Sequence, residues 1–131
     1  MVVDSSALLA VLLGEPARDA VANAMAQTDN ALQISAVNFV EASVVIETRK
    51  GPAGLIALDR LIEKAGVRIA AVDDAVAREA RDAYRKFGKG RHPAKLNLGD
   101  CFAYALAKTL GEPILCTGRD FSKTDITVVL S

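Results

Sequence analysis

Histidine and cysteine, the residues that bind most structural zinc ions, are scarce in this chain. His92 is the only histidine, and Cys101 and Cys116 stand apart from each other in apolar segments. These residues supply no zinc site, and they favour buried free thiols over a disulfide. Free thiols suggest a reducing compartment only weakly.

Long apolar runs and a net charge are also absent. No apolar stretch approaches the roughly 18 residues of a membrane span, and the N-terminus lacks a basic segment followed by a long apolar one. We therefore expect a soluble cytoplasmic protein with no membrane partner. Basic and acidic residues are equal in number, 16 of each, so the net charge says nothing about nucleic acid and any electrostatic footprint must be local.

The length of the chain, 131 residues, and its hydrophobic content of 51% suit one core, so we expect a single domain over residues 1–131. Short β-rich runs alternate with longer helical patterns, which is typical of an α/β protein with a mainly parallel sheet. The expected strands cover about 1–4, 31–34, 67–72, 114–116 and 126–130. The expected helices cover about 5–13, 16–27, 36–50, 53–65, 74–87 and 99–110. Ser5 or Ser6 is the expected N-cap of the first helix.

Three acids lie in or beside apolar segments, with no Lys or Arg next to them in sequence. Asp4 ends the first strand, Glu41 accompanies Val44 on the presumed inward stripe of a helix, and Asp100 opens a very apolar helix. A buried carboxylate costs several kcal/mol unless a cation balances it. The economical explanation is that the fold gathers these acids around a divalent cation.

A fourth acid, Asp120, follows the strand 114–116 and should reach the same edge of the sheet as Asp4, beyond the carboxyl ends of the strands. Two carboxylates about 4 Å apart repel by roughly 4 kcal/mol at an effective dielectric constant near 20, so the cluster holds protons or a cation. Oxygen ligands favour Mg²⁺ or Mn²⁺. Such an ion keeps waters, one of which can attack a phosphodiester.

Four segments resemble, in order and approximate spacing, the acidic motifs of PIN-domain ribonucleases, particularly the VapC-type toxins of bacterial toxin–antitoxin pairs. They are MVVDSSAL at 1–8, SAVNFVEA at 35–42, LNLGDCFAYALA at 96–107 and LCTGRDFSKTD at 115–125. The resemblance spans nearly the whole chain. It implies a PIN-like three-layer fold with a central, mainly parallel sheet flanked by helices.

The same resemblance implies an activity and partners. The protein would be an endoribonuclease whose Mg²⁺ or Mn²⁺ is held by Asp4, Glu41 and Asp100, and it would form homodimers and be neutralised by a cognate VapB-type antitoxin. The family places its fourth acid at the position of Asp120, although Asp125 lies only five residues further on. The alternative function is a catalytically silent PIN-like module whose acidic pocket binds a partner or a cation.

The segment 85–95, RKFGKGRHPAK, carries five basic residues and no acid, and it comes shortly before Asp100. Such a loop could hold RNA phosphates, and Lys89, Arg91 and Lys95 are the candidate contacts. A solvated helix end and loop is the ordinary alternative.

Each of the other candidates also has an ordinary explanation. Asp4 could simply cap a helix, Glu41 could turn outward, and Asp100 could be a favourable acid in a first helical turn. Asp120 could stabilise a turn. Two further polar residues have two alternative roles, one at the site and one within their own loops. They are Asn97 and Thr117.

Overall fold

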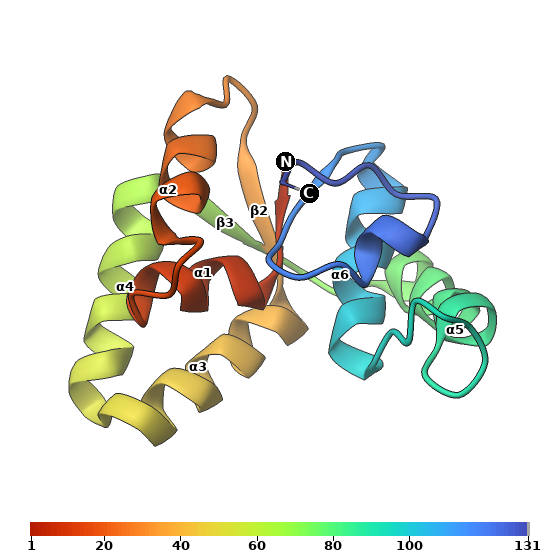
Figure 1. Ribbon diagram of the computed structural model, residues 1–131, viewed down its shortest axis with the longest axis horizontal. Coiled ribbons are helices and arrows are strands. Elements are labelled where there is room, and N and C mark those ends of the chain that lie inside the picture. Colours follow the sequence, from red (N-terminus) through yellow and green to blue (C-terminus); the bar gives the residue numbers. More distant parts are fainter. Residues whose placement is uncertain (131) are drawn as a thin grey trace.

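The computed structural model describes residues 1–130; Ser131, the last residue of the expected domain, lies outside the described residues. Four strands form one parallel sheet in the order β3-β2-β1-β4 (Figure 1). They are β1 (Val2–Val3), β2 (Leu32–Ser35), β3 (Val67–Ala70) and β4 (Ile114–Leu115). The α/β fold with a parallel sheet, expected from the sequence, is confirmed.

Six α-helices cover the two faces of this sheet. They are α1 (Ser5–Leu12), α2 (Arg18–Gln27), α3 (Ala36–Lys50), α4 (Pro52–Ala65), α5 (Asp74–Phe87) and α6 (Leu98–Leu110), and a short 3₁₀ helix, η1 (Phe121–Lys123), follows β4. Figure 1 shows α1 to α4 on one side of the sheet and α5 and α6 on the other, which makes three layers. None of the helices within residues 1–130 is long and apolar enough to cross a membrane.

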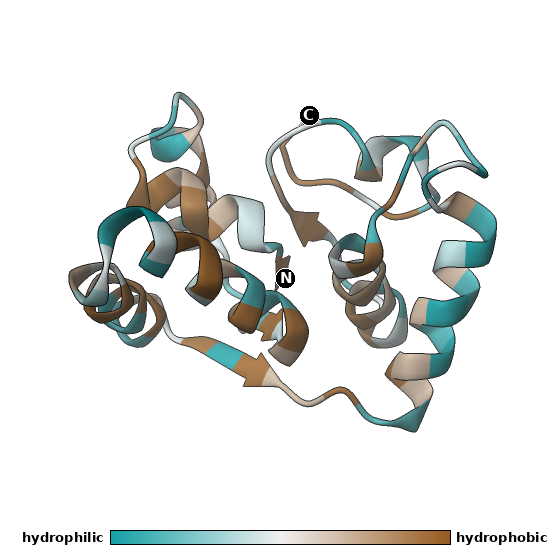
Figure 2. Ribbon diagram, turned by 90° about the horizontal axis from the view of Figure 1, so that it is seen from below, coloured by the Kyte–Doolittle hydropathy of each residue, from teal (hydrophilic) through white to brown (hydrophobic). Residues whose placement is uncertain are grey.

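The central strand β1 divides two hydrophobic clusters. Val2 and Val3 are both fully buried, and because successive strand residues point to opposite faces, Val2 packs with α5 and α6 while Val3 packs with α1 to α4. Helix α5 is hydrophilic along its outer side (Figure 2). Helix α6 is buried nearly all round, as its apolar sequence predicts. The position of β1 brings whatever follows it to the middle of the sheet.

Most helix ends agree with local chemistry. Gly51, with φ of 66°, ends α3 and is followed by Pro52 in the first turn of α4. The second helix begins at Arg18 instead of residue 16, because the backbone N–H of Arg18 bonds the Glu15 carbonyl in a turn. The strand expected at 126–130 is wrong: Val128 makes only one isolated bridge with β4. Strand β4 has just two residues, and Ile114 alone faces this segment, with its N–H bonded to the Thr127 carbonyl and its carbonyl to the Val129 N–H, so the ladder does not lengthen.

Candidate active site

Asp4 stands directly after β1 and is 3% exposed. Its backbone N–H donates to the Leu115 carbonyl (2.9 Å), and its Oδ2 accepts from the backbone N–H of Ser6 (3.1 Å). Asp4 is therefore the N-cap of α1; the expectation that Ser5 or Ser6 caps it is wrong, because the chain stays extended through Asp4 (φ −79°, ψ 155°). Its Oδ1 is buried and has no hydrogen-bond partner among the described residues. One oxygen caps the helix and the other is left for a ligand.

Glu41 lies on the second turn of α3, at the margin of its buried face. That face carries Asn38, Ala42 and Ile46, whereas Val44 is 59% exposed, so the inward stripe expected through Val44 is wrong. The spacing of three or four residues from Asn38 defines the face, and Val44 falls on the other side. Glu41 Oε1 accepts from Asn38 Nδ2 (3.4 Å) and from the hydroxyl of Ser5, the first residue of α1. The carboxylate is thus directed into the molecule and not outward.

Asp100 occupies the first turn of α6 and forms a reciprocal capping box with Asn97. Asp100 Oδ2 accepts from the Asn97 backbone N–H (3.0 Å), and Asn97 Oδ1 accepts from the Asp100 backbone N–H (2.8 Å). Burial raises the pKa of Asp100 to about 6; the Asn97 N–H opposes this, and the charges of Asp4, Glu41 and Asp120 raise it further. Asn97 therefore caps α6 with its side chain and holds the Asp100 side chain with its backbone N–H. Asp100 lies within electrostatic reach of three other acids.

Asp120 lies in the exposed segment between β4 and η1. Its side chain makes no capping hydrogen bond at the start of η1, so the turn-stabilising alternative has no contact to support it. Its charge contributes to the raised pKa of Asp100. The loop that carries it is tied to α1, because the Thr117 backbone N–H donates to Ser6 Oγ (3.0 Å). Thr117 therefore joins the two segments that bring Asp4 and Asp120 to the same rim.

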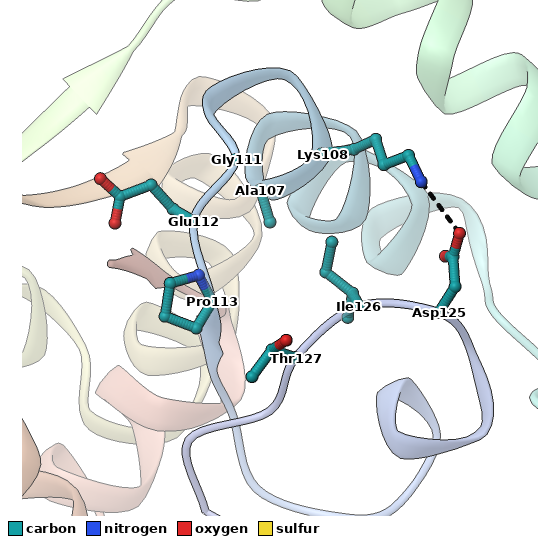
Figure 3. A pocket seen from close by; sticks show the side chains of 8 residues that line it. All are labelled: Ala107, Lys108, Gly111, Glu112, Pro113, Asp125, Ile126 and Thr127. Atoms are coloured by element: carbon teal, nitrogen blue, oxygen red, sulfur yellow. Dashed lines mark hydrogen bonds and ion pairs between the residues drawn. The ribbon is translucent and has the colours of Figure 1, made fainter.

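Asp125, the other candidate for the fourth acid, has different partners. Its Oδ1 accepts from the Tyr104 hydroxyl (2.5 Å) and its Oδ2 pairs with Lys108 Nζ (2.9 Å), and these contacts lower its pKa. Figure 3 shows the Lys108–Asp125 pair beside a cavity of about 260 Å³ at the C-terminal end of α6, near Gly111. Lys108 follows Asp100 by eight residues, about 12 Å along the helix axis. The contacts of Asp125 therefore point to a structural role.

The thiol of Cys116, directly after β4, is affected by the charges of three of the acids. Burial raises the pKa of its thiol to about 12, and the charges of Asp4, Asp100 and Asp120 add to that effect in this order. The thiol stays protonated and is a poor nucleophile and a poor metal ligand. Three acids from three separate segments thus lie within electrostatic reach of one buried residue at the carboxyl end of β4.

The donor atoms of the acidic group suit a hard cation. Within residues 1–130, no three Asp, Glu, His or Cys side chains stand close enough together, as oriented here, to share one ion. However, the buried Oδ1 of Asp4 has no partner, and burial followed by Glu41 raises the pKa of Asp4 as well. A donor set made only of carboxylate oxygens suits Mg²⁺ or Mn²⁺.

The basic segment forms a closed loop after α5. A bridge between Gly88 and Leu96 joins its ends. Lys89, Arg91 and Lys95 are exposed and line a shallow cavity of about 530 Å³, and none of the three forms an ion pair among the described residues. Their free charges suit phosphate contacts. The solvated-loop alternative has the same appearance and stays open.

Sequence reasoning missed three residues that touch Glu41, namely Ser5, Asn38 and Gly99. Ser5 Oγ donates to Glu41 Oε1 (2.5 Å), and Gly99 packs directly against the carboxylate. Asn38 precedes Glu41 by three residues, a spacing that places both on one helix face, so this contact had a local signal. The other two contacts come from α1 and α6 and had none.

The family model for the PIN domain matches residues 1–126 of this chain. The chain belongs to the PIN-domain family. Among its relatives, "Ribonuclease VapC" of Mycolicibacterium smegmatis is 46% identical over 129 residues, covering 98% of this chain and 99% of the relative. "Ribonuclease VapC30" of Mycobacterium tuberculosis is 45% identical over 129 residues, covering 98% of each. The resemblance to VapC-type PIN domains is thus confirmed.

Solved structures agree on the fold. A VapC20 toxin of Mycobacterium tuberculosis, described as cleaving the sarcin–ricin loop, superposes with a TM-score of 0.79 at 16% identity, covering 96% of this chain and 95% of that one. VapBC2 of Rickettsia felis, bound to a DNA fragment of its promoter, gives a TM-score of 0.76 at 13% identity, covering 97% and 95%. At these identities the likeness concerns the fold alone, and it confirms the PIN-like three-layer architecture.

Proposed function

We propose that this PIN-domain protein is a VapC-type endoribonuclease toxin that cleaves RNA phosphodiester bonds with Mg²⁺ or Mn²⁺. The observation that carries the proposal is the buried Oδ1 of Asp4, which follows the central strand and has no hydrogen-bond partner among the described residues. Burial raises the pKa of Asp100, and the charges of Asp4, Glu41 and Asp120 raise it further. Relatives that are 42–46% identical and named as ribonucleases support it. Asp4, Glu41, Asp100 and Asp120 would hold the ion. When bound, the ion supplies an activated water and offsets charge on a phosphoryl oxygen.

The residues around the acids prepare them for this task. Asp4 and Asp100 have raised pKa values, so protons compete with the cation at these oxygens and metal binding should weaken as the pH falls. The backbone N–H groups of Ser6 and Asn97 each hold one oxygen of these acids in place. The capped oxygen is thus fixed, which reduces the freedom that a ligand loses when the ion arrives.

The basic loop would bind the RNA backbone. Lys89, Arg91 and Lys95 project from a loop whose last residues lead directly into Asn97 and the first turn of α6. Lys95 has a φ of 53°, a conformation that non-glycine residues adopt rarely, so the loop holds this residue in a defined place despite the cost. Contacts to phosphate would position the strand without reading its sequence.

An antitoxin partner is supported by neighbours that are toxin–antitoxin complexes, including one from Klebsiella pneumoniae with a TM-score of 0.71 at 18% identity. We propose a VapB-type antitoxin and a homodimer for this chain. Exposed apolar side chains on α3 and α4 offer surfaces for such contacts, namely Val40, Val44 and Ile56. Since RNA is the proposed substrate, the cytoplasm is the expected compartment.

The test is cleavage of RNA by purified protein with added Mn²⁺, with EDTA as the negative condition. Asp100→Asn keeps the shape of the side chain but removes a ligand charge, so cleavage should fall at least about a hundredfold while the protein stays folded. Asp59→Asn, an exposed acid on α4, is the matched control and should cleave normally. A folded Asp100→Asn protein with full activity would contradict the metal role of Asp100. Wild-type protein without metal-dependent cleavage would favour the silent binding module.

A further inference from the structure

The carboxylate of Glu41 is pressed against the backbone of α6 at Gly99. A Cβ atom at position 99 would overlap with Glu41 Oε2 and would lie only 2.9 Å from its Cδ. Gly99 has an ordinary helical place, next to Asp100, so backbone freedom does not explain the glycine. The missing side chain leaves the space that the Glu41 carboxylate fills.

Asn38 holds the same carboxylate from the other side. It is fully buried, and its Nδ2 donates to the Gly99 carbonyl (2.9 Å) and to Glu41 Oε1 (3.4 Å). Both neighbours are acceptors, which determines the orientation of the amide. Asn38 thus links α3, through its own helix position, to the first turn of α6.

Asn38 carries a cost that its contribution to the fold does not explain. Its Oδ1 is buried without a hydrogen-bond partner among the described residues. An unsatisfied buried acceptor costs about 1–3 kcal/mol, whereas an apolar side chain of similar shape avoids that cost. Asn38 otherwise occupies the apolar face of α3 beside Ala42 and Ile46. An amide at this position is therefore better explained by what it holds than by packing.

We propose that Asn38 is a positioning residue that, together with the space left by Gly99, holds the Glu41 carboxylate in register with Asp100 for metal binding. The inference rests on the metal role of Glu41 proposed above. Ser5 supplies the third contact, so Glu41 is held from α1, α3 and α6 at once. Groups that orient a metal ligand typically change metal affinity by 10–100-fold when removed.

Two variants test the proposal by Mn²⁺ titration calorimetry, with thermal melts in EDTA. Asn38→Leu removes the donor and also the unsatisfied acceptor, so Mn²⁺ should bind about tenfold more weakly or worse, while the melting temperature in EDTA stays close to that of wild type. Gly99→Ala displaces only the flexible end of Glu41, so it should also fold and should lose Mn²⁺ affinity to a similar degree.

Gly54→Ala is the matched control for both. A Cβ at Gly54 would lie 2.7 Å from the Ile46 carbonyl, five residues after Glu41 along α3, and would not touch Glu41. This variant should lower the melting temperature but leave the Mn²⁺ affinity unchanged. This control distinguishes an effect of disturbed α3 packing on Mn²⁺ affinity from an effect of the displaced Glu41 carboxylate.

A second comparison asks whether Asn38 acts through Glu41. In a Glu41→Gln background, Asn38→Leu should cause no further loss of Mn²⁺ affinity, since the group it positions is no longer a charged ligand. If Asn38→Leu lowers the Mn²⁺ affinity by the same factor in the wild-type and in the Glu41→Gln background, the proposal is overturned. It is also overturned if folded Asn38→Leu or Gly99→Ala binds Mn²⁺ with wild-type affinity. If Asp100→Asn still abolishes binding in that case, the metal site stands and only the positioning role fails. Absence of Mn²⁺ binding by wild-type protein overturns both.

Discussion

Substituting Asp4 with asparagine separates the two tasks of its carboxylate. Asn caps helices as well as Asp does, so the contact with the Ser6 N–H is kept. The charge at the buried Oδ1 is lost, and with it one metal ligand. Asp4→Asn should therefore stabilise the metal-free protein and weaken its response to metal.

The size of the effect follows from the burial of Asp4. The amide of Asn leaves a polar atom where Oδ1 stood, so the gain comes from removal of the buried charge and of its repulsion by Glu41, on the order of 1 kcal/mol. For a chain of this length 1 kcal/mol shifts the melting temperature by roughly 4 °C. The variant should therefore melt about 4 °C above wild type in EDTA. Mn²⁺ at a hundredfold excess over Kd stabilises wild type by about 2.7 kcal/mol, near 10 °C, and should stabilise the variant clearly less.

Melts of both proteins in EDTA and in Mn²⁺ at neutral pH provide the measurement. Asp73→Asn is the control, because Asp73 caps α5 through the Val76 N–H (2.9 Å) and its charge is not among those that shift the pKa of Asp4 or Asp100. It should change little in either condition. If Asp4→Asn instead lowers the melting temperature equally with and without Mn²⁺, Asp4 is only a cap and the acidic cluster is not a metal site.

Three further predictions follow from the same structure. Replacing Lys89, Arg91 and Lys95 with Ala should weaken RNA binding and flatten the plot of log affinity against log salt by about 0.7 per lost contact; an unchanged slope would assign the loop to solvent. In EDTA, the free energy of unfolding should fall as pH rises from 3.8 to about 6, because folded Asp100 keeps a proton that the unfolded chain has lost. The shift corresponds to about 3 kcal/mol, reduced to roughly 1–2 by the partial exposure of Asp100; stability that rises in urea titrations over this pH range would contradict it. Asp125→Asn should lower the melting temperature by at most about 4 °C and leave Mn²⁺ affinity unchanged, whereas loss of affinity in calorimetry would make it a ligand.

The features that sequence reasoning predicted well are local ones. The burial of Asp4 and the partial burial of Asp100 were expected because each lies next to an apolar run, whereas their metal role stays a prediction. The buried character of α6 followed from its composition. The alternation of strands and helices predicted the parallel sheet. The strand order and the side on which each helix packs came only from the structure.

The features that it missed depend on tertiary contacts. Val44 was placed on the inner face of α3, yet only the packing of Asn38 against α6 determines which face is inner. Asp120 was preferred over Asp125 only through the family resemblance, and the contacts that separate the two acids, from Asp125 to Tyr104 and Lys108, are tertiary. Gly99 looked like an ordinary glycine because its neighbour, the Glu41 carboxylate, comes from a helix far away in sequence.

The order of the strands has a consequence for the synthesis of this protein. Strand β1 lies at the centre of the sheet, but its partner β4 is formed by residues 114–115, and Thr117 reaches back 111 residues to Ser6. Domains fold as units while the ribosome adds about 5–20 residues per second. Asp4 is synthesised first, and Asp100 and Asp120 become available only after most of the remaining chain has been made. A nascent chain whose β4 is still inside the ribosome cannot yet bring the Asp120 segment beside Asp4, so the proposed cleavage centre would assemble only after nearly all of the chain has been made.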